Sequence, residues 1–405
     1  MQVIGASKIF LCDEKFHILE NGGIAFEKGK IKDLGDYQKL CMQYGGGEFF
    51  ENSVLLPTFT NPHIHFEFSA NHANFLYGSF DKWLDSVMQK REDVLNDNTK
   101  AIKEAIGQQL DSGVGSVGAI SSYGDDMEIL ASCPLKVVFF HEALGSNAAA
   151  LDFLHQNFLQ RLEHSKALQS ESFFPGIALH SPYSVHFVFA KKLLELARKE
   201  NYPTSVHFLE SSIEREWLEH SSGWFLEFFK KTLQVKNPRS LYEIEEFIEL
   251  FLGLDTLFVH CLHATESEIS KLTQTGYIVT CPRSNRLLNN KLFPLQQAPI
   301  HKILFATDGK SSNNNLNFLE ELRTALFAYA NEDLENLAKN LLLSATRYGA
   351  ESLRLNSGSL CKGLDADFSI FEIEQITQSK QAPLQFLLQA QKAKALFING
   401  KKILG

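Results

Sequence analysis

The sequence has no pair of cysteines in a Cys-x-x-Cys spacing. The six cysteines of the chain are Cys12, Cys41, Cys133, Cys261, Cys281 and Cys361. This scatter does not fit a disulfide framework or a structural zinc knot, because both need cysteines at close and repeated spacings. We therefore expect reduced cysteines that pack as small hydrophobic side chains.

Long apolar runs and an excess of positive charge are missing as well. No apolar run approaches the roughly 18 residues that a membrane-spanning helix needs. The formal net charge of −9 gives no basic surface for nucleic acid. Residues 1–15 lack the continuous apolar core of an export signal. We expect a globular, cytoplasmic protein without a nucleic-acid or membrane partner.

Short strand-like pieces occur at both ends of the chain. They are residues 3–4, 8–11, 23–26 and 30–31 near the start and residues 367–371 and 395–400 near the end. This shared pattern predicts that the two termini pair into one small β domain, formed by residues 1–53 and 356–405.

Between these ends, apolar strand-like runs alternate with amphipathic helical segments. Eight strands are predicted, at residues 54–59, 114–120, 137–140, 177–179, 204–206, 257–259, 278–280 and 303–306. Helices fit at residues 100–110, 190–199 and 266–272, and the capping box Thr265-x-x-Glu268 opens the last of these. Such alternation predicts a closed parallel (β/α)8 barrel over residues 54–355.

Histidines collect where the predicted strands end, which is where barrel enzymes place their active sites. Six of the eight strands end in histidine or aspartate: His63 and His65, His141, His180, His207, His260, and Asp308. A polar rim would account for one or two of these histidines, but not for all of them. The sequence therefore predicts a metal site at the barrel mouth.

The segment Asn61-Pro62-His63-Ile64-His65 follows the first predicted strand. Residues two apart in an extended chain face the same side, so both imidazoles can bind one ion. Imidazoles and a carboxylate without thiolate suit zinc or ferrous iron. The fourth strand ends in Leu179-His180-Ser181-Pro182-Tyr183, which has no lysine to bridge two ions. We predict one divalent ion, Zn²⁺ with Fe²⁺ as the alternative.

Several motifs of the chain together resemble the amidohydrolase superfamily, in its branch of mononuclear aminohydrolases that act on adenosine-like compounds. They are Asn61-Pro62-His63-Ile64-His65, His180-Ser181-Pro182-Tyr183, His207-Phe208-Leu209-Glu210, His260-Cys261-Leu262-His263, Cys281-Pro282-x-Ser284-Asn285 and Thr307-Asp308-Gly309-x-x-Ser312-Asn313-Asn314. The resemblance implies an α/β fold, a (β/α)8 barrel with a composite domain from both termini, which we expect to be a small β-sandwich.

The same resemblance implies roles for individual residues. It assigns the metal to His63, His65, His207 and Asp308. Asp308 would also take a proton from the attacking water. Glu210, three residues after a ligand, would be the proton shuttle to the ring nitrogen and the departing ammonia. His260 would stabilise charge at the attacked carbon.

Substrate contacts are implied at the barrel mouth. Glu92 matches the place of a carboxylate for the ribose hydroxyls, although it also fits a solvated helix face. His180 is expected to contact the substrate, with a packed rim histidine as the alternative. Ser284, Asn285 and Arg286 follow the seventh strand and complete the predicted set. Glu67 is expected to brace the His-x-His turn, and His141 and His263 receive no role.

Within this branch, residues 68–70, 75–80 and 83–91 look more like the aminofutalosine deaminases of menaquinone synthesis than the S-adenosylhomocysteine deaminases. The former convert 6-amino-6-deoxyfutalosine to futalosine and ammonia. The benzoate-bearing tail of that substrate needs a cation, and Arg91, Arg283 and Arg286 are the arginines nearest the predicted mouth. An arginine suits this role because it binds a carboxylate in a bidentate way. Of the three, we favour Arg286.

Other functions stay open at this stage. An S-adenosylhomocysteine, 5′-methylthioadenosine or adenosine deaminase would share the same site, and amide or halide hydrolysis would share the metal. A non-catalytic barrel would be expected to have lost a ligand or the shuttle, and none is missing. We expect a small-molecule nucleoside as the partner, and a homodimer is a possible assembly.

Overall fold

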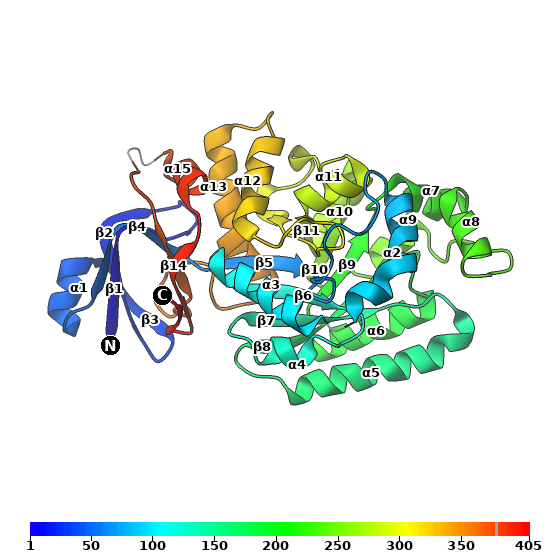
Figure 1. Ribbon diagram of the computed structural model, residues 1–405, viewed down its shortest axis with the longest axis horizontal. Helices are drawn as coiled ribbons and strands as arrows, with labels where there is room; N and C mark the ends of the chain where they lie inside the picture. The colour runs from blue at the N-terminus through cyan, green and yellow to red at the C-terminus, as the bar shows by residue number, and fades with distance from the viewer. Residues whose placement is uncertain (97, 377–379) are drawn as a thin grey trace.

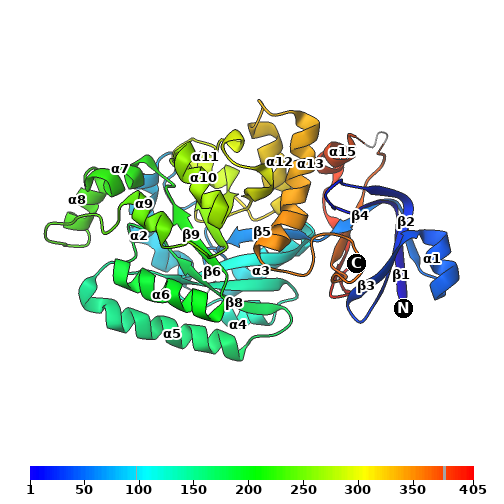
Figure 2. The same ribbon diagram turned by 180° about the vertical axis from the view of Figure 1, so that it is seen from behind.

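Two sheets organise the computed structural model, which describes residues 1–96, 98–376 and 380–405 (Figure 1). One sheet has eight strands in the order β12-β11-β10-β9-β8-β7-β6-β5, and the other has seven in the order β15-β14-β13-β4-β1-β2-β3. The seven-stranded sheet lies beside the barrel and carries both termini (Figures 1 and 2). Within the described ranges, no helix is long and apolar enough to cross a membrane.

The eight-stranded sheet is parallel throughout, and helices surround it. Its strands are β5 (Phe59–Ile64), β6 (Val114–Ser121), β7 (Lys136–Ala143), β8 (Phe173–Leu179), β9 (Thr204–Phe208), β10 (Thr256–His260), β11 (Gly276–Thr280) and β12 (Ile303–Phe305). Its helices are α2 (Phe80–Leu95), α3 (Thr99–Asp111), α4 (Met127–Ala131), α5 (Leu151–Ala167), α6 (Phe187–Glu200), α7 (Ser212–His220), α8 (Trp224–Lys231), α9 (Ile244–Glu249), α10 (Glu266–Thr275), α11 (Pro282–Asn289), α12 (Phe318–Ala328), α13 (Leu334–Leu343) and α14 (Gly349–Ser352). The predicted (β/α)8 barrel is confirmed.

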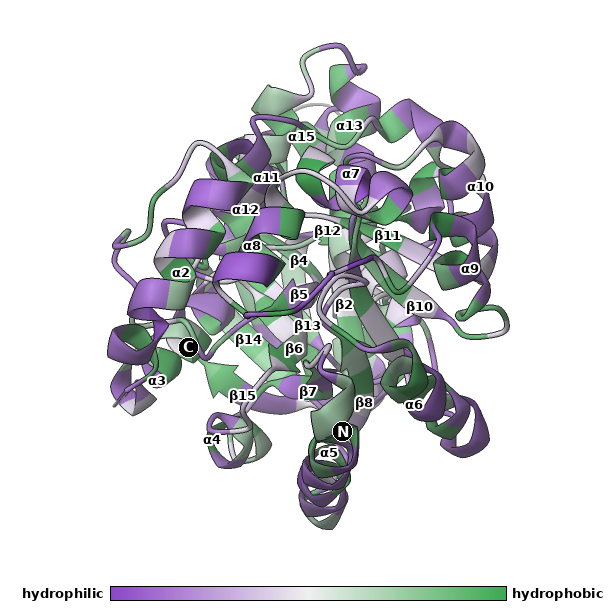
Figure 3. Ribbon diagram, turned by 90° about the vertical axis from the view of Figure 1, so that its right-hand side faces the viewer, coloured by the Kyte–Doolittle hydropathy of each residue, from purple (hydrophilic) through white to green (hydrophobic). Residues whose placement is uncertain are grey.

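The barrel strands are apolar because helices cover their outer side and packed side chains fill their inner side. Every residue of β6, β7 and β10 is buried. A parallel strand buried on both faces reads as a continuous apolar run. Figure 3 shows these hydrophobic strands inside a ring of helices that present hydrophilic residues outward. The capping box predicted for α10 is formed by Thr265 and Glu268.

Side chains join the first and last strands of the barrel. The Asn61 side chain accepts a hydrogen bond from the backbone of Thr307 at 3.2 Å and donates one to its hydroxyl at 2.8 Å. The backbone N–H of Asp308 donates to the carbonyl oxygen of His63 at 3.2 Å. This closure brings Asp308, at the end of the barrel sequence, next to the His-x-His segment at its beginning.

The first predicted barrel strand, residues 54–59, is divided between the two sheets. Residues 54–57 end β4 (Glu48–Pro57), which pairs with β1 and β13 of the seven-stranded sheet. The barrel strand β5 begins only at Phe59. Residues 54–57 and all of β5 are buried, so their apolar runs join in the sequence without a visible break. The predicted division into two domains at residues 53 and 356 stays a prediction.

The two termini pair in one sheet, as predicted. Its remaining strands are β1 (Gln2–Phe10), β2 (Ile18–Glu27), β3 (Lys30–Asp36), β13 (Phe368–Glu372), β14 (Ala393–Ile398) and β15 (Lys401–Leu404), with helices α1 (Tyr37–Tyr44) and α15 (Ala382–Gln389) beside them. The Phe26 ring in β2 lies 5.5 Å from Phe368 in β13 and 6.0 Å from Phe397 in β14. The expected sandwich is therefore a single sheet that curls over its own core.

A buried ion cluster joins β7 of the barrel to the seven-stranded sheet. The Lys136 ammonium lies 2.7 Å from Asp365 and 2.5 Å from Asp367, and Lys136 and Asp367 are each 2% exposed. Lys30 also bonds Asp365.

We expect Lys136→Met to lower the free energy of unfolding by about 3 kcal/mol, because removing one partner of a buried ion pair leaves an uncompensated charge. Thermal unfolding measures this change as a lower midpoint. Lys392→Met is the control, because its pair with Asp111 is largely exposed. Equal midpoints in the two variants would contradict the expectation.

Candidate metal centre and active site

The four predicted metal ligands lie together at the carboxyl end of the barrel. The Nε2 atom of His63 is 3.2 Å from Nε2 of His65 and 3.3 Å from Nε2 of His207. The Oδ1 atom of Asp308 is 3.6 Å from Nε2 of His63 and 3.6 Å from Nε2 of His65. Strand β5 and the residue after it, strand β9 and the loop after β12 supply these side chains.

The three imidazoles fit a divalent ion. Zinc–nitrogen bonds of 2.0–2.1 Å in a tetrahedral site place the nitrogens about 3.3–3.4 Å apart, close to the observed spacing. The Nδ1 atom of His207 lies 2.8 Å from the carbonyl oxygen of His180, which can only accept. Nδ1 therefore carries the hydrogen, and Nε2 presents its lone pair to the cluster. Burial, with a contribution from His63, lowers the pKa of His65 to about 3, so this imidazole is neutral at pH 7.

The Asp308 carboxylate is held in place on both oxygens. Asp308 has a backbone φ of 58°. Its Oδ2 accepts hydrogen bonds from Ser284 at 2.7 Å and Ser312 at 2.8 Å, and Oδ1 accepts from the N–H of Gly309 at 2.8 Å. Burial raises the pKa of this carboxyl, but His63 and the other nearby imidazoles outweigh it and hold the pKa well below the usual range. Asp308 is thus ionised.

Glu210 and His260 stand beside this cluster. The Oε1 atom of Glu210 lies 3.7 Å from Nε2 of His260, and that nitrogen lies 3.9 Å from Oδ2 of Asp308. Burial, with a contribution from the Asp308 charge, raises the pKa of Glu210 well above its usual value. This shift favours the protonated form of Glu210, which is the form that can donate a proton. An ionised carboxylate and a carboxyl group with a raised pKa are placed together, as acid–base chemistry requires.

The Amidohydrolase family matches residues 54–403. The chain belongs to this family. It is 40% identical to the aminodeoxyfutalosine deaminase of Nitratiruptor sp. over 390 residues, which cover 95% of this chain and 96% of the relative. It is 41% identical to the adenosine deaminase of Helicobacter pylori over 100% of both chains. The crystal structure of H. pylori aminofutalosine deaminase in complex with methylthio-coformycin superposes with a TM-score of 0.95, at 41% identity and with 100% of both chains covered.

Two residues predicted to contact substrate lie within the polar cluster of this amidohydrolase. Ser284 and Asn285 are both 0% exposed. Ser284 bonds Asp308, and the Asn285 amide oxygen lies 2.8 Å from Nδ1 of His260. The Asn285 amide group donates to Thr280 at 3.1 Å. Since their polar atoms are engaged inside the protein, these placements favour orientation of Asp308 and His260 over substrate contact.

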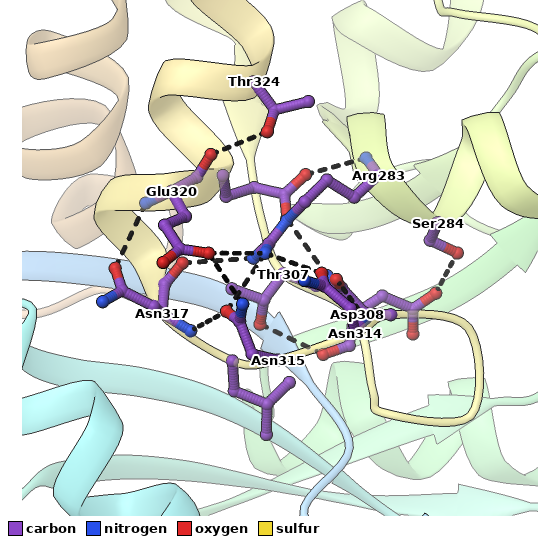
Figure 4. A network of polar contacts seen from close by, with 12 residues as sticks. Arg283, Ser284, Thr307, Asp308, Asn314, Asn315, Asn317, Glu320 and Thr324 are labelled. Atoms are coloured by element: carbon purple, nitrogen blue, oxygen red, sulfur yellow. Dashed lines mark hydrogen bonds and ion pairs between the residues drawn. The ribbon is translucent and has the colours of Figure 1, made fainter. Parts of the chain in front are cut away.

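The arginines near the mouth differ in availability. Arg283 donates to Glu321 at 2.6 Å and also bonds Asn314, Asn315 and the backbone of Asn317 (Figure 4). This network engages its guanidinium, so Arg283 is not free for a substrate carboxylate. Arg286 is exposed in the last turn of α11, and Arg91 is half-buried on α2.

The remaining two predicted substrate contacts are placed differently from each other. His180 lies beside the metal cluster: its ring centroid is 5.3 Å from that of His207, and its Nδ1 is 2.8 Å from the Ser184 hydroxyl. Glu92 is exposed on α2. Among the described residues, no bond joins its carboxyl group to the clustered histidines. The structure therefore brings His180 to the site and leaves Glu92 on an exposed part of α2.

The reading of strand ends missed Glu142 and misplaced its neighbour. Glu142 is 1% exposed, and its Oε1 lies 3.6 Å from Nδ1 of His207. His141, predicted to lie at the mouth, points outward, with Nε2 2.7 Å from the Ser165 hydroxyl of α5. Successive residues of a strand face opposite sides, so only one of this pair can face the barrel interior.

Glu67 braces a different loop from the one expected. Its carboxylate accepts hydrogen bonds from the backbone N–H groups of Ser122 at 2.8 Å, Tyr123 at 2.9 Å and Gly124 at 3.1 Å. These residues form the loop after β6. Glu67 thus ties the segment after the His-x-His motif to the neighbouring strand, a long-range contact that the local sequence does not reveal.

Proposed function

We propose that the chain is a metal-dependent deaminase that hydrolyses the 6-amino group of 6-amino-6-deoxyfutalosine to give futalosine and ammonia. The observation that carries the proposal is the convergence of three imidazoles and Asp308 beside Glu210, a carboxyl group whose pKa burial raises. It is supported by the 40% identity to the aminodeoxyfutalosine deaminase of Nitratiruptor sp.. The fit to the aminofutalosine deaminase structure of H. pylori also favours it.

The ligand chemistry suits zinc or ferrous iron, and we propose zinc. His63, His65, His207 and Asp308 would hold one divalent ion through nitrogen and oxygen atoms without thiolate, which suits Zn²⁺ and also Fe²⁺. When bound, such an ion lowers the pKa of water to about 7 and so supplies a hydroxide nucleophile near neutral pH.

The side chains of the protein would divide the proton transfers between them. Ionised Asp308 accepts the proton of the attacking water. Protonated Glu210 would donate to the ring nitrogen N1, and the carboxylate left behind would take the hydroxyl proton at C6 and pass it to the amino group, which leaves as ammonia. The proton accepted by Asp308 would then return to Glu210. The Nδ1–H group of His260 donates to the amide oxygen of Asn285, so Nε2 is left as an acceptor. His260 could therefore hold the attacking water by accepting a hydrogen bond from it. In total, one C–O bond forms at C6 and one C–N bond breaks, with water consumed.

Recognition of the substrate would come from the loops around this cluster. His180 is proposed to contact the purine, and Glu92 the ribose hydroxyls. Arg286 is proposed to bind the carboxylate of the tail, and its support is its exposure on α11, directly after the β11 end. Among the described residues no ion pair of Arg286 is present, in contrast to Arg283.

We expect kcat/KM for aminofutalosine to exceed that for adenosine, S-adenosylhomocysteine and 5′-methylthioadenosine in a panel scored by ammonia release. Arg286→Met should lower kcat/KM for aminofutalosine about 10–100-fold, the worth of a charge-assisted hydrogen bond, and leave adenosine turnover nearly unchanged. Arg91→Met tests the rival cation in the same assay. A preference for S-adenosylhomocysteine, or an equal loss on both substrates, would contradict the tail-binding proposal.

A second candidate is deamination of adenosine itself, or of its 5′-substituted relatives. It is favoured by the 41% identity to the adenosine deaminase of H. pylori. The same panel separates the two candidates, because adenosine lacks the carboxylate-bearing tail. Halide hydrolysis would release its leaving group without a proton, and amide hydrolysis would offer Glu210 no ring nitrogen to protonate. A place in menaquinone synthesis, a cytoplasmic location and a homodimer stay predictions from the sequence.

A further inference from the structure

The turn between β9 and α7 carries the proposed shuttle in an uncommon backbone conformation. Leu209 has a φ of 48°, in the left-handed region. This region is unfavourable for a residue with a branched apolar side chain, so the surrounding structure must hold it there. Leu209 lies between the metal-ligand strand and Glu210, and it is 0% exposed. Leu209 directly precedes Glu210, so its conformation contributes to the direction in which the Glu210 side chain leaves the backbone.

The carboxylate of Glu214 holds this turn. Its Oε1 accepts a hydrogen bond from the N–H of Leu209 at 3.0 Å, and its Oε2 accepts one from the N–H of Glu210 at 2.9 Å. Glu214 is 0% exposed and lies in the first turn of α7. The hydroxyl of Ser211, the N-cap residue, accepts from the N–H of Glu214 at 3.2 Å. Two buried backbone donors are therefore satisfied by the two oxygens of one side chain.

We propose that Glu214 is a positioning residue for the reaction: it fixes the backbone of Leu209 and Glu210 and so aims the Glu210 carboxyl group at the reacting atoms. This inference rests on the proposed function, in which Glu210 is the proton shuttle. A carboxyl group is required because two N–H donors need two acceptor oxygens. A glutamine offers only one, and its amide group would face an N–H donor.

The neighbouring helix α10 shows what an ordinary capping glutamate does in this protein. Glu268 accepts a hydrogen bond at 2.6 Å from the N–H of Thr265, the N-cap residue of its own helix. It also pairs with Arg215 at 3.0 Å. Glu214 occupies the same place in the motif Ser-x-x-Glu, but it reaches beyond its N-cap residue to the turn that carries Glu210. Its bonds therefore serve the site as well as the helix.

The decisive variant is Glu214→Gln, assayed with aminofutalosine or adenosine. We expect kcat to fall about 10–100-fold, since a misplacement of about 1 Å can cost this much, while KM changes less than about twofold. Metal content should stay near that of the wild type, because no proposed ligand is altered. Glu214→Asp keeps both oxygens on a shorter side chain and should lose less, and it replaces the glutamine variant if that protein does not fold.

Glu268→Gln is the matched control. It weakens a capping box of the same kind on the adjacent helix, and Glu268 is not part of the proposed machinery. We expect a lower unfolding midpoint with kcat close to that of the wild type. An equal loss of kcat in Glu214→Gln and Glu268→Gln, or a normal kcat in Glu214→Gln, would overturn the positioning role.

Hydrogen exchange gives a readout that does not depend on the substrate. The backbone N–H groups of Leu209 and Glu210 should exchange faster in Glu214→Gln than in the wild type, and at the wild-type rate in Glu268→Gln. If the wild type deaminates no nucleoside, the proposed function fails, and this exchange difference still decides whether Glu214 holds the turn. Unchanged exchange in Glu214→Gln would overturn the inference by itself.

Discussion

The variants His65→Ala and Asp308→Ala are expected to retain less than about a tenth of the wild-type metal and to show no measurable deamination. Each removes one of four proposed ligands, and loss even of a residue that only supports a ligand costs about 10–100-fold in metal affinity. Without the ion, the pKa of water stays near 15.7 rather than about 7, so little nucleophile forms at neutral pH.

Elemental analysis after gel filtration measures the metal content directly. His141→Gln is the matched control, because His141 also lies near the end of a barrel strand but bonds Ser165 on the outer side. It should keep its metal. Full metal content in both His65→Ala and Asp308→Ala would refute the proposed centre, whatever the activity of the two proteins.

The sequence predicted the barrel and the ligand cluster because both depend on regular spacing. Parallel strands end at the same edge of a sheet, so histidines and aspartates at successive strand ends are brought together without knowledge of side-chain contacts. His63, His207 and Asp308 meet in this way, although 245 positions separate the first from the last. The same reasoning failed for His141, because a shift of one residue along a strand moves a side chain to the other face.

Side-chain contacts between residues far apart in the chain could not be predicted from the sequence. The sequence predicts Arg283, Ser284 and Asn285 at the end of β11. In the structure they lie in the first turn of α11, which begins at Pro282, and they are buried there. The partner of Arg283 is Glu321, 38 residues later. A guanidinium that looks available in the sequence is thus held by a contact that only the fold creates. The proposed role of Glu214 could not be predicted for a related reason. In the sequence, Ser211-x-x-Glu214 has the pattern of an ordinary helix cap.

Replacement of Glu210 by glutamine should separate metal binding from proton transfer. Glu210→Gln keeps the size of the side chain and alters no proposed ligand, so the metal content should equal that of the wild type. We expect kcat to fall by about 10²–10⁴-fold, the usual worth of general acid–base catalysis, because an amide cannot supply the proton that the ring nitrogen and the leaving amine need.

The leaving group provides the sharpest test of this role. In 6-chloropurine riboside, chloride departs without a proton, so only protonation of the ring nitrogen still depends on Glu210. The loss of kcat in Glu210→Gln should therefore be smaller on the chloropurine than on adenosine, measured with the same metal-replete protein. Near-normal turnover of adenosine by that protein would place the proton shuttle elsewhere. A loss on adenosine with the metal retained and the chloropurine partly spared would identify Glu210 as the acid that releases ammonia.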